Sequence, residues 1–313
     1  MKTATLKYRQ KDEHSIVGRM LGKDSFQAYL MLLPMLIGFA FFTIYPMLWL
    51  MKWAFYDYDG ITTAKFIGID NFIRAFTRDP KYWEALLNTF IIVFAKLAIE
   101  FPLALFLAVL LNKGTRINSM FRTAFFMPTI ISTAVIGLIF FLMFEPYQGI
   151  VNQVFIKTGL MDTSIEWFGT KALANTIIVI ASVWHNFGIN MVFFLMGMQT
   201  IPNELYECAE IDGVTRWQKF IYITLPMLAP IMKVLLMLAI IGSMKMADLV
   251  LVLTNGQPGG QTEVVMTYVF KYFFSYGVSD SMNQFGYASS LSVITAMVLA
   301  VITGLYYKLT KND

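Results

Sequence analysis

The segment ELYECAEIDGVTRWQKFIYITLP, residues Glu204–Pro226, is charged, is broken by a glycine and lies between two long apolar runs. Just before it, Pro202 and Asn203 predict the start of a short helix, because proline suits the first helical turn and asparagine caps free backbone N–H groups. Gly213 can adopt the left-handed conformation that ends a helix, and Thr215 is placed to cap a second one. The spacing therefore predicts two short polar helices joined at Gly213.

One face of the first short helix carries small side chains. At spacings of three and four residues, this face comprises Leu205, Cys208, Ala209 and Asp212. Small side chains at positions 208 and 209 would let the backbone of a partner approach closely. The segment has four acidic residues and two basic ones, and anionic lipid headgroups repel an acidic loop. We therefore expect it to dock on a protein surface; the alternative is a solvated loop between membrane helices.

The composition places the chain in a lipid bilayer. Of its 313 residues, 57% are hydrophobic and 14% are charged, far from the average of soluble domains. The net charge of +4 is modest and is explained better by membrane orientation than by nucleic acid. A single cysteine excludes a disulfide framework and a cysteine-based zinc site. The two histidines, His14 and His185, are too far apart in the sequence to indicate a metal centre.

Several apolar stretches reach the ~20 residues needed to cross the hydrocarbon layer. They lie at about 27–51, 85–111, 123–143, 172–198, 227–253 and 286–308. Prolines within or at the ends of these spans are tolerable where neighbouring helices or waters satisfy the freed carbonyl groups. The sequence therefore predicts an all-α membrane protein with six transmembrane helices and no second soluble domain.

Lysines and arginines predict the orientation of these helices, because they gather on the cytoplasmic side. Residues 1–26 form a basic N-terminal tail with six of them, whereas the loops 144–171 and 254–285 together hold three. The loop 52–84 holds five, which is a weak contradiction. On balance we expect both termini and the 204–226 segment in the cytoplasm.

The spacing inside the 204–226 segment resembles a known motif. Glu207-x-Ala209-x-x-x-Gly213, followed after nine residues by Ile223-x-Leu225-Pro226, resembles the EAA loop of binding-protein-dependent ABC transporter permeases, in particular their sugar-type branch. Cys208 departs from the pattern, since the family usually has alanine there. In that family the loop is a coupling helix that fits a groove on a cytoplasmic ATPase. The resemblance therefore implies a coupling loop at about 202–226, with these ATPase-coupling residues: Glu207, Ala209, Asp212, Gly213, Leu225 and Pro226.

Further landmarks extend this resemblance from about residue 28 to the end of the chain. They are Gly68–Phe72, Leu87–Thr89, Phe121–Thr123, Leu253–Gly256 with Pro258, and Phe285–Ala288. The resemblance implies the permease fold of a type I ABC importer over residues 27–313, in a bacterial cytoplasmic membrane.

Polar side chains at membrane depth usually face a cavity or another helix. The fourth span carries a stripe of Ser182, His185, Asn186 and Ile189, which starts beside Trp184. Trp184 could stack on a sugar ring, and the imidazole and amide could bond to sugar hydroxyls. In maltose-type permeases this span lines the translocation path, which implies that the stripe contacts substrate. The alternative is hydrogen bonding between helices.

The fifth span carries Ser243, Lys245 and Asp248. The two charged residues are three positions apart and could neutralise one another, so a path-lining role and a structural ion pair both remain open. In the second span, Lys96 and Glu100 are four positions apart and are interpreted as a structural pair, not as a substrate site.

The third span supplies three hydroxyl groups after Pro128. Those of Thr129, Ser132 and Thr133 could face substrate or bond back to the carbonyl groups of their own helix. The predicted substrate path therefore comprises Thr129, Thr133, Ser182, His185, Asn186, Ser243, Lys245 and Asp248.

The chain lacks the phosphate-binding pattern G-x-x-x-x-G-K-[ST], since its nearest glycine–lysine pair, Gly22-Lys23, is followed by Asp24. No Ser/His/Asp or paired-carboxylate constellation is apparent either. We therefore predict no catalytic residue and no metal or cofactor bound by this chain, with ATP and Mg²⁺ held by partner ATPase subunits. The resemblance implies as partners a second homologous permease, two ATPase subunits and an extracellular substrate-binding protein.

The sequence therefore predicts a permease subunit of an ATP-driven importer for a sugar or oligosaccharide, with glycerol phosphate or a polyol as the alternative cargo. A second alternative is a secondary transporter that uses Lys96/Glu100 or Lys245/Asp248 as a proton or ion relay. A self-powered carrier of that kind would not need a docking loop. A third alternative is a membrane assembly subunit that transports nothing.

Overall fold

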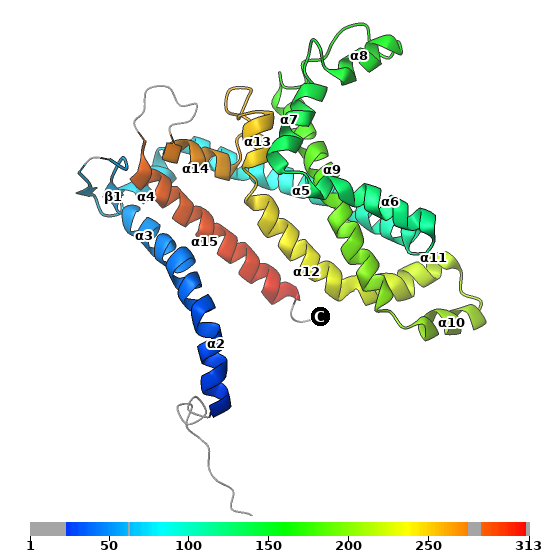
Figure 1. Ribbon diagram of the computed structural model, residues 1–313. Coiled ribbons are helices and arrows are strands. Elements are labelled where there is room, and N and C mark those ends of the chain that lie inside the picture. The colour runs from blue at the N-terminus through cyan, green and yellow to red at the C-terminus, as the bar shows by residue number, and fades with distance from the viewer. Residues whose placement is uncertain (1–22, 62, 275–282, 311–313) are drawn as a thin grey trace, which may run out of the picture. The chain divides into compact units, whose positions relative to one another are not determined.

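The computed structural model describes residues 23–61, 63–274 and 283–310, and most of them are helical (Figure 1). Within these ranges, five helices are long and apolar enough to cross a membrane, and a bent pair of helices would make a sixth crossing. The predicted all-α membrane fold is confirmed at this level. The chain divides into two compact units, Met1–Trp53 and Ala54–Asp313, which are described separately.

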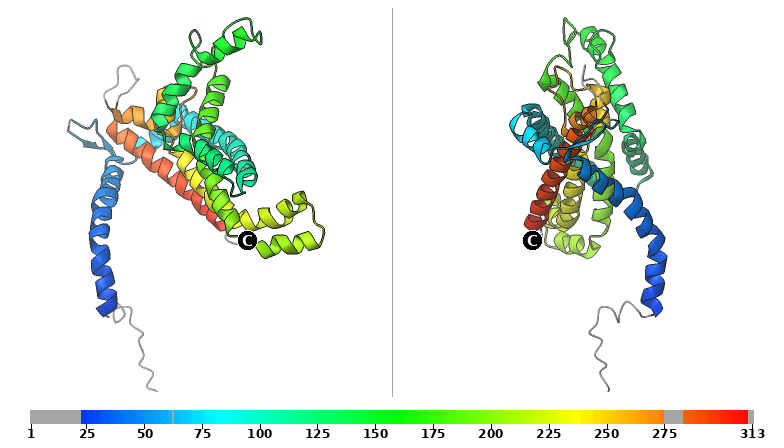
Figure 2. Two further views of the ribbon diagram at one scale, coloured as in Figure 1. Left: turned by 45° about the vertical axis from the view of Figure 1, so that its right-hand side comes forward. Right: turned by 90° about the vertical axis from the view of Figure 1, so that its left-hand side faces the viewer.

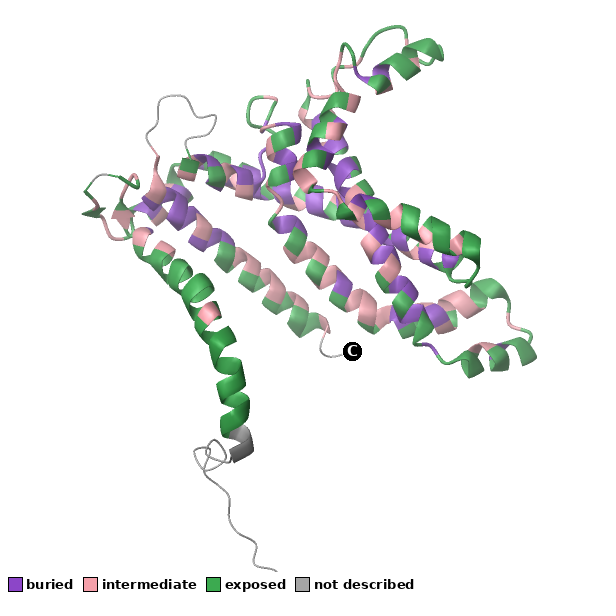
Figure 3. Ribbon diagram, in the orientation of Figure 1, coloured by how far each residue is buried: buried purple, intermediate pink, exposed green. Residues whose placement is uncertain are grey.

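The first unit contains one apolar helical stretch. It comprises α2 (Lys23–Phe39), a π-helical turn η1 (Ala40–Ile44) and α3 (Tyr45–Trp53). Together they confirm the span predicted at 27–51. Figure 3 shows this stretch as exposed along nearly its whole length. Most of the predicted cytoplasmic tail at 1–26 lies outside the described residues.

The second unit begins with a short hairpin that was not predicted from the sequence. Its strands β1 (Tyr56–Asp57) and β2 (Lys65–Phe66) pair antiparallel, and helix α4 (Asp70–Thr77) follows. The Asn71 side chain donates hydrogen bonds of 3.0 Å to two backbone carbonyl groups of the hairpin segment. The landmark at Gly68–Phe72 therefore ties α4 to the hairpin.

The two longest helices of the second unit are α5 (Pro80–Leu111) and α9 (Lys171–Gln199), which pack along each other (Figure 1). They confirm the spans predicted at 85–111 and 172–198. Buried apolar side chains from both helices form most of the core, and the buried stripes are visible in Figure 3. Helices in a membrane associate by such close packing, because lipid tails are as apolar as the side chains.

The span predicted at 123–143 is wrong as a continuous helix. Helix α6 (Arg116–Phe126) runs into a 3₁₀ turn, η2 (Met127–Ile130), and α7 (Thr133–Met143) leaves at a bend of 97°. Pro128 lies in this turn and has no backbone N–H to continue the helical ladder. The backbone after the turn is extended, so carbonyl groups there need other partners.

The span predicted at 227–253 is also wrong as a single helix. Helix α12 (Leu225–Met244) ends at Met244, inside the predicted span, and α13 (Asp248–Leu253) is a separate short helix. A broken helix at membrane depth is tolerated where the break is enclosed by protein or lines a cavity. The polar residues predicted in this span lie at the break between α12 and α13. The segment therefore does not form one unbroken apolar helix.

The remaining elements lie toward the two ends of the second unit. Helix α8 (Ile150–Lys157) follows α7, and α14 (Val265–Phe274) precedes the last helix, α15 (Phe285–Thr310), which confirms the span predicted at 286–308. Figures 1 and 2 show α10 (Asn203–Ile211) at the same end as the C-terminal end of α15. Helices α8 and α14 lie toward the opposite end.

Candidate functional site

A cavity of about 370 Å³ lies between α5, α7, α9, α12 and α13. Its volume is within the range of small-ligand pockets. Seven of the eight predicted path residues line it: Thr133, Ser182, His185, Asn186, Ser243, Lys245 and Asp248. Ile189, the apolar member of the predicted stripe, lines it too. The fold therefore brings residues from three predicted spans to one place.

Thr129, the eighth predicted residue, is not among the residues that line the cavity. Its hydroxyl donates to the backbone carbonyl of His185 at 2.9 Å, and the Nε2 atom of His185 lies 3.0 Å from the carbonyl of Ile131. Because a carbonyl only accepts, Nε2 donates the proton in that contact. His185 therefore donates a hydrogen bond to a carbonyl at the break after η2. It also lines the cavity, where a cargo molecule could contact it.

The ion pair considered for Lys245 and Asp248 is absent from the described residues. The prediction rested on helical spacing, but α12 ends at Met244, so the two residues do not share one helix face. The hydroxyl of Thr133 instead donates a long hydrogen bond of 3.4 Å to the carboxylate of Asp248. Both charged side chains are exposed and line the cavity.

Asn186 uses part of its polar capacity within its own helix, since its amide nitrogen donates to the carbonyl of Ser182 at 2.8 Å. Its amide oxygen accepts no hydrogen bond from the residues that the structure describes, so it remains available as an acceptor. Trp184, for which stacking on a sugar ring is predicted, does not line the cavity. Its ring packs on Phe140, with the ring centroids 5.8 Å apart.

Four buried residues, Lys96, Glu100, Asn190 and Ser243, form a polar cluster in the cavity wall, which we call the buried polar node. The Nζ atom of Lys96 lies 3.5 Å from Oε2 of Glu100 and donates to the hydroxyl of Ser243 at 2.9 Å. Asn190 donates a short hydrogen bond to Oε1 of Glu100. The pairing predicted for Lys96 and Glu100 is confirmed, but both also line the cavity, which was not predicted.

Asn190 was missed from the sequence, although a signal was present. It lies four residues after Asn186, on the same face of α9 as the predicted stripe. Its contact with Glu100 joins α9 to α5, and the contact of Lys96 with Ser243 joins α5 to α12. The node therefore fixes three helices around the cavity. Among the described residues, no three His, Cys, Asp or Glu side chains are grouped as a metal site requires.

The 202–226 segment forms the predicted short helix before Gly213, but the second helix is not short: it begins at Arg216 and continues as one helix to Met244. Helix α10 ends before Gly213, whose φ of 71° is the predicted left-handed conformation. Thr215 caps α11 (Arg216–Lys219) through a reciprocal capping box. Helix α10 itself begins at Asn203, with Pro202 in the cap position, so the predicted asparagine cap is wrong.

Two contacts hold α10 against the start of the long helix that follows. The Nζ atom of Lys219 lies 2.6 Å from Oε1 of Glu210, and the hydroxyl groups of Tyr206 and Thr224 are 2.9 Å apart. The hydrogen bond from Lys219 and its charge lower the pKa of Glu210. A π-helical turn, η3 (Phe220–Thr224), connects α11 to α12. The segment therefore continues into the membrane helix without a flexible joint.

The predicted coupling residues differ in exposure. Glu207, Asp212, Gly213 and Pro226 are exposed, and Leu225 is half-buried in the first turn of α12. Ala209 is only 8% exposed, because its own chain covers it. The expectation that a partner's backbone approaches Ala209 is therefore wrong, whereas Cys208 is exposed.

Three large apolar side chains on this segment were missed from the sequence. Ile211, Trp217 and Tyr222 are 86%, 68% and 74% exposed. The signal is present in the sequence, since all three apolar residues lie within the 23 residues of this otherwise charged segment. Exposed aromatic and apolar groups in a polar segment are typical of protein contact surfaces.

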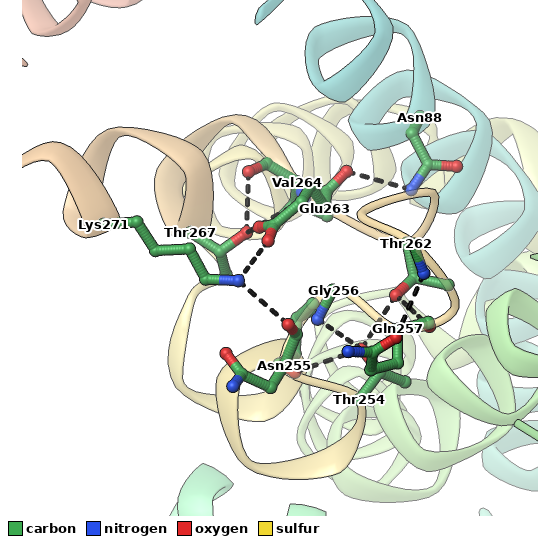
Figure 4. A network of polar contacts seen from close by, with 12 residues as sticks. Asn88, Thr254, Asn255, Gly256, Gln257, Thr262, Glu263, Val264, Thr267 and Lys271 are labelled. Carbon is green, nitrogen blue, oxygen red and sulfur yellow. Dashed lines mark hydrogen bonds and ion pairs between the residues drawn. The ribbon is translucent and has the colours of Figure 1, made fainter. Parts of the chain in front are cut away.

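A second polar cluster lies in the loop between α13 and α14, toward the end away from α10 (Figures 1 and 4). Lys271 donates to the carbonyl of Asn255 at 2.9 Å and forms a close ion pair with Glu263. The backbone carbonyl of Glu263 accepts a hydrogen bond of 3.1 Å from Asn88 on α5. Two of the predicted landmark segments meet here, and their residues anchor the loop to the longest helix.

Comparison with known proteins gives one family and relatives that match nearly the whole chain. Residues 100–311 match the family described as binding-protein-dependent transport system inner membrane component. The chain is 33% identical over 292 residues to the probable ABC transporter permease protein YesP of Bacillus subtilis, covering 93% of this chain and 92% of the relative. It is 31% identical over 282 residues to the lactose transport system permease protein LacF of Rhizobium radiobacter, covering 89% and 92%.

A crystal structure of a bacterial alginate ABC transporter, in complex with an alginate pentasaccharide-bound periplasmic protein, contains a chain of similar fold. The TM-score is 0.80 at 24% sequence identity, over 95% of this chain and 97% of that chain. The predicted ABC importer permease fold is therefore confirmed.

Proposed function

Because the chain belongs to the family of binding-protein-dependent transport system inner membrane components, we propose that it forms the translocation path of an ABC importer for a sugar or an oligosaccharide. Membership makes the chain a permease, that is, a transport subunit with several membrane-spanning helices. The proposal that the cargo is a sugar is supported by the relative that is named for lactose transport. The lining of the cavity supports the same choice.

The observation that carries the proposal is a polar cavity bordered by two broken helices. It presents hydroxyl, amide and imidazole groups together with apolar side chains, the mixture that a polyhydroxylated ligand requires. Its two lysines, Lys96 and Lys245, are matched by two carboxylates, Glu100 and Asp248. An uncharged sugar or polyol suits this balance better than glycerol phosphate, whose anionic group would need an excess of positive charge.

The proposed contacts follow from the cavity lining. Substrate hydroxyls are bound by Thr133, Ser182, His185, Asn186, Ser243, Lys245 and Asp248. Thr129 acts indirectly, because its hydrogen bond to the His185 carbonyl holds the third and fourth spans together beside the cavity.

The 202–226 segment is the proposed docking site for a cytoplasmic ATPase subunit. Glu207, Asp212, Gly213 and the Leu225–Pro226 corner carry the contact, and Ala209 supports them from beneath. The exposed side chains of Ile211, Trp217 and Tyr222 support a protein partner. Because η3 continues directly into α12, a displacement of α10 and α11 would be passed to the helix that borders the cavity.

The proposed importer contains this chain, a second homologous permease, two ATPase subunits that hold ATP and Mg²⁺, and an extracellular substrate-binding protein. Both termini of the chain lie in the cytoplasm of a bacterium. ATP binding favours one conformation of the helices, and release of hydrolysis products favours the other, so the cavity opens alternately to the two sides.

The experiment is uptake by proteoliposomes that contain the complete importer. Labelled lactose, maltose, sorbitol and glycerol 3-phosphate are offered with the cognate substrate-binding protein. We expect uptake of a sugar that requires internal ATP, the binding protein and both permeases. Uptake by this chain alone, or uptake abolished by an uncoupler while ATP is preserved, would support the secondary-transporter alternative. ATPase activity that ignores both sugar and binding protein would support the assembly-subunit alternative.

A further inference from the structure

The buried polar node has hydrogen-bonding capacity that the protein does not use. The ammonium group of Lys96 has three N–H donors, and one of them reaches the Ser243 hydroxyl at 2.9 Å. Its distance of 3.5 Å from Oε2 of Glu100 is an ion-pair contact but is too long for a strong hydrogen bond. Oε2 is buried and accepts no hydrogen bond from the described residues. A buried carboxylate oxygen in that state is costly, so a further donor is expected.

Both residues belong to the wall of the cavity, so a molecule in the cavity can supply the missing contact. The group that completes the pair must accept a hydrogen bond from Lys96 and donate one to Glu100. A hydroxyl group does both. A carboxylate or phosphate only accepts and is repelled by Glu100, whereas an ammonium group only donates and is repelled by Lys96.

We propose that Lys96 and Glu100 form a subsite that binds one hydroxyl group of the cargo and favours an uncharged sugar over uronates and sugar phosphates. This inference rests on the proposed function and assigns a role to a pair that sequence spacing alone marks as structural. The other two members of the node position the pair. Asn190 holds Oε1 of Glu100, and Ser243 holds the ammonium group of Lys96.

The test uses the complete importer in proteoliposomes and a disaccharide that it transports, chosen from lactose, maltose and trehalose. Uptake of the parent sugar is compared with uptake of each of its single-deoxy analogues. The ratio of the two rates is then compared between wild type and variant, so selection by the binding protein cancels. A hydrogen bond to a charged group corresponds to about a tenfold difference or more.

The main variant combines Lys96→Met with Glu100→Gln. It removes both charges together, so neither charge is left buried without its partner, and the glutamine amide oxygen can still accept from Asn190. Glu84→Gln is the matched control, because Glu84 lies on the same helix, is exposed and does not line the cavity. Glu100→Asp is a second variant that keeps the charge and withdraws the carboxylate by one methylene group.

For one deoxy analogue, we expect the ratio of parent-sugar uptake to analogue uptake to be about tenfold larger in wild type and in the control than in the double variant. Glu100→Asp is expected to lose part of the same discrimination. Unchanged ratios for every analogue in both variants would overturn the inference and identify the pair as structural. That result is distinct from failure of the proposed function, in which the wild-type importer would take up no sugar at all.

Discussion

Gly188 on α9 lies directly against the backbone carbonyl of Phe125 on α6: a Cβ atom at position 188 would be 2.0 Å from that oxygen. Phe125 lies three residues before Pro128, the proline of the 3₁₀ turn, so this contact holds the broken third span against α9. The hydrogen bonds of Thr129 and His185 act at the same junction. The bend beside the cavity therefore depends on a residue without a side chain.

Gly188→Ala is expected to destabilise the chain by about 1–3 kcal/mol or more, because a carbonyl of the backbone cannot move aside as a flexible side chain would. The measurement is thermal stability of the purified importer in detergent. Gly304→Ala is the control, since α15 has open space at that position and alanine favours a helix. Equal stability of Gly188→Ala and wild type would contradict the close approach.

Most of the membrane-spanning stretches could be predicted from the sequence, because long apolar runs are a strong signal. The two errors, at 123–143 and 227–253, share a cause. Apolar composition reports that a segment lies in the membrane, but it does not report whether the helix is continuous. Helical spacing therefore predicts Lys245 and Asp248 on one helix face, whereas they lie at the break between α12 and α13.

The cavity lining was predicted better than the roles of its members. Helical spacing identified the face of α9 that lines the cavity, since Ser182, His185 and Asn186 lie on one stripe. The contact of His185 with the Ile131 carbonyl depends on where the third span breaks, which spacing does not report. For the same reason, the approach of Lys96 to Ser243, from helices far apart in sequence, was not foreseen.

Substitution of Gly213 tests the geometry of the coupling segment. Its φ of 71° is strained for a β-branched residue but acceptable for asparagine, so Gly213→Val is expected to disturb the turn between α10 and α11, and Gly213→Asn is the control. The strain amounts to about 1–2 kcal/mol at an exposed position, too little to prevent membrane insertion. We expect severalfold slower uptake with Gly213→Val at normal protein levels. Equal uptake by the two variants would show that the turn does not transmit force.

The contact between Glu210 and Lys219 predicts a pH dependence. The pKa of Glu210 is lowered in the folded protein, so the contact adds stability above the unfolded pKa and loses it as the pH falls through the folded pKa. The effect is small, because Glu210 is exposed and solvent screens the pair. The melting temperatures of wild type and Glu210→Gln are expected to differ near neutral pH and to converge in acid. A difference that grows toward acid would contradict this sign.

The single cysteine of the chain tests the orientation of the membrane helices. Cys208 is exposed on α10, so a membrane-impermeant maleimide is expected to label it in inverted vesicles but not in intact cells. The control is Tyr147→Cys in a Cys208→Ser background, because Tyr147 is 81% exposed and lies three residues before α8, the helix at the opposite end. This control should be labelled in intact cells. Labelling of Cys208 from outside would place the segment on the wrong side for an ATPase partner.

Asn186→Ala tests whether the α9 stripe binds cargo or only stabilises the helix. The amide nitrogen bonds to the Ser182 carbonyl, but that carbonyl belongs to the same helix, and alanine favours a helix, so little stability is lost. The amide oxygen is the group available to a sugar hydroxyl, and its loss corresponds to about a fivefold weaker response. The measurement is the sugar concentration that half-maximally stimulates ATPase activity, with the binding protein in fixed excess. Thr176→Ala, on an exposed face of α9 outside the cavity, should leave that concentration unchanged. If Asn186→Ala behaves like this control, the stripe serves helix packing and the cargo passes elsewhere.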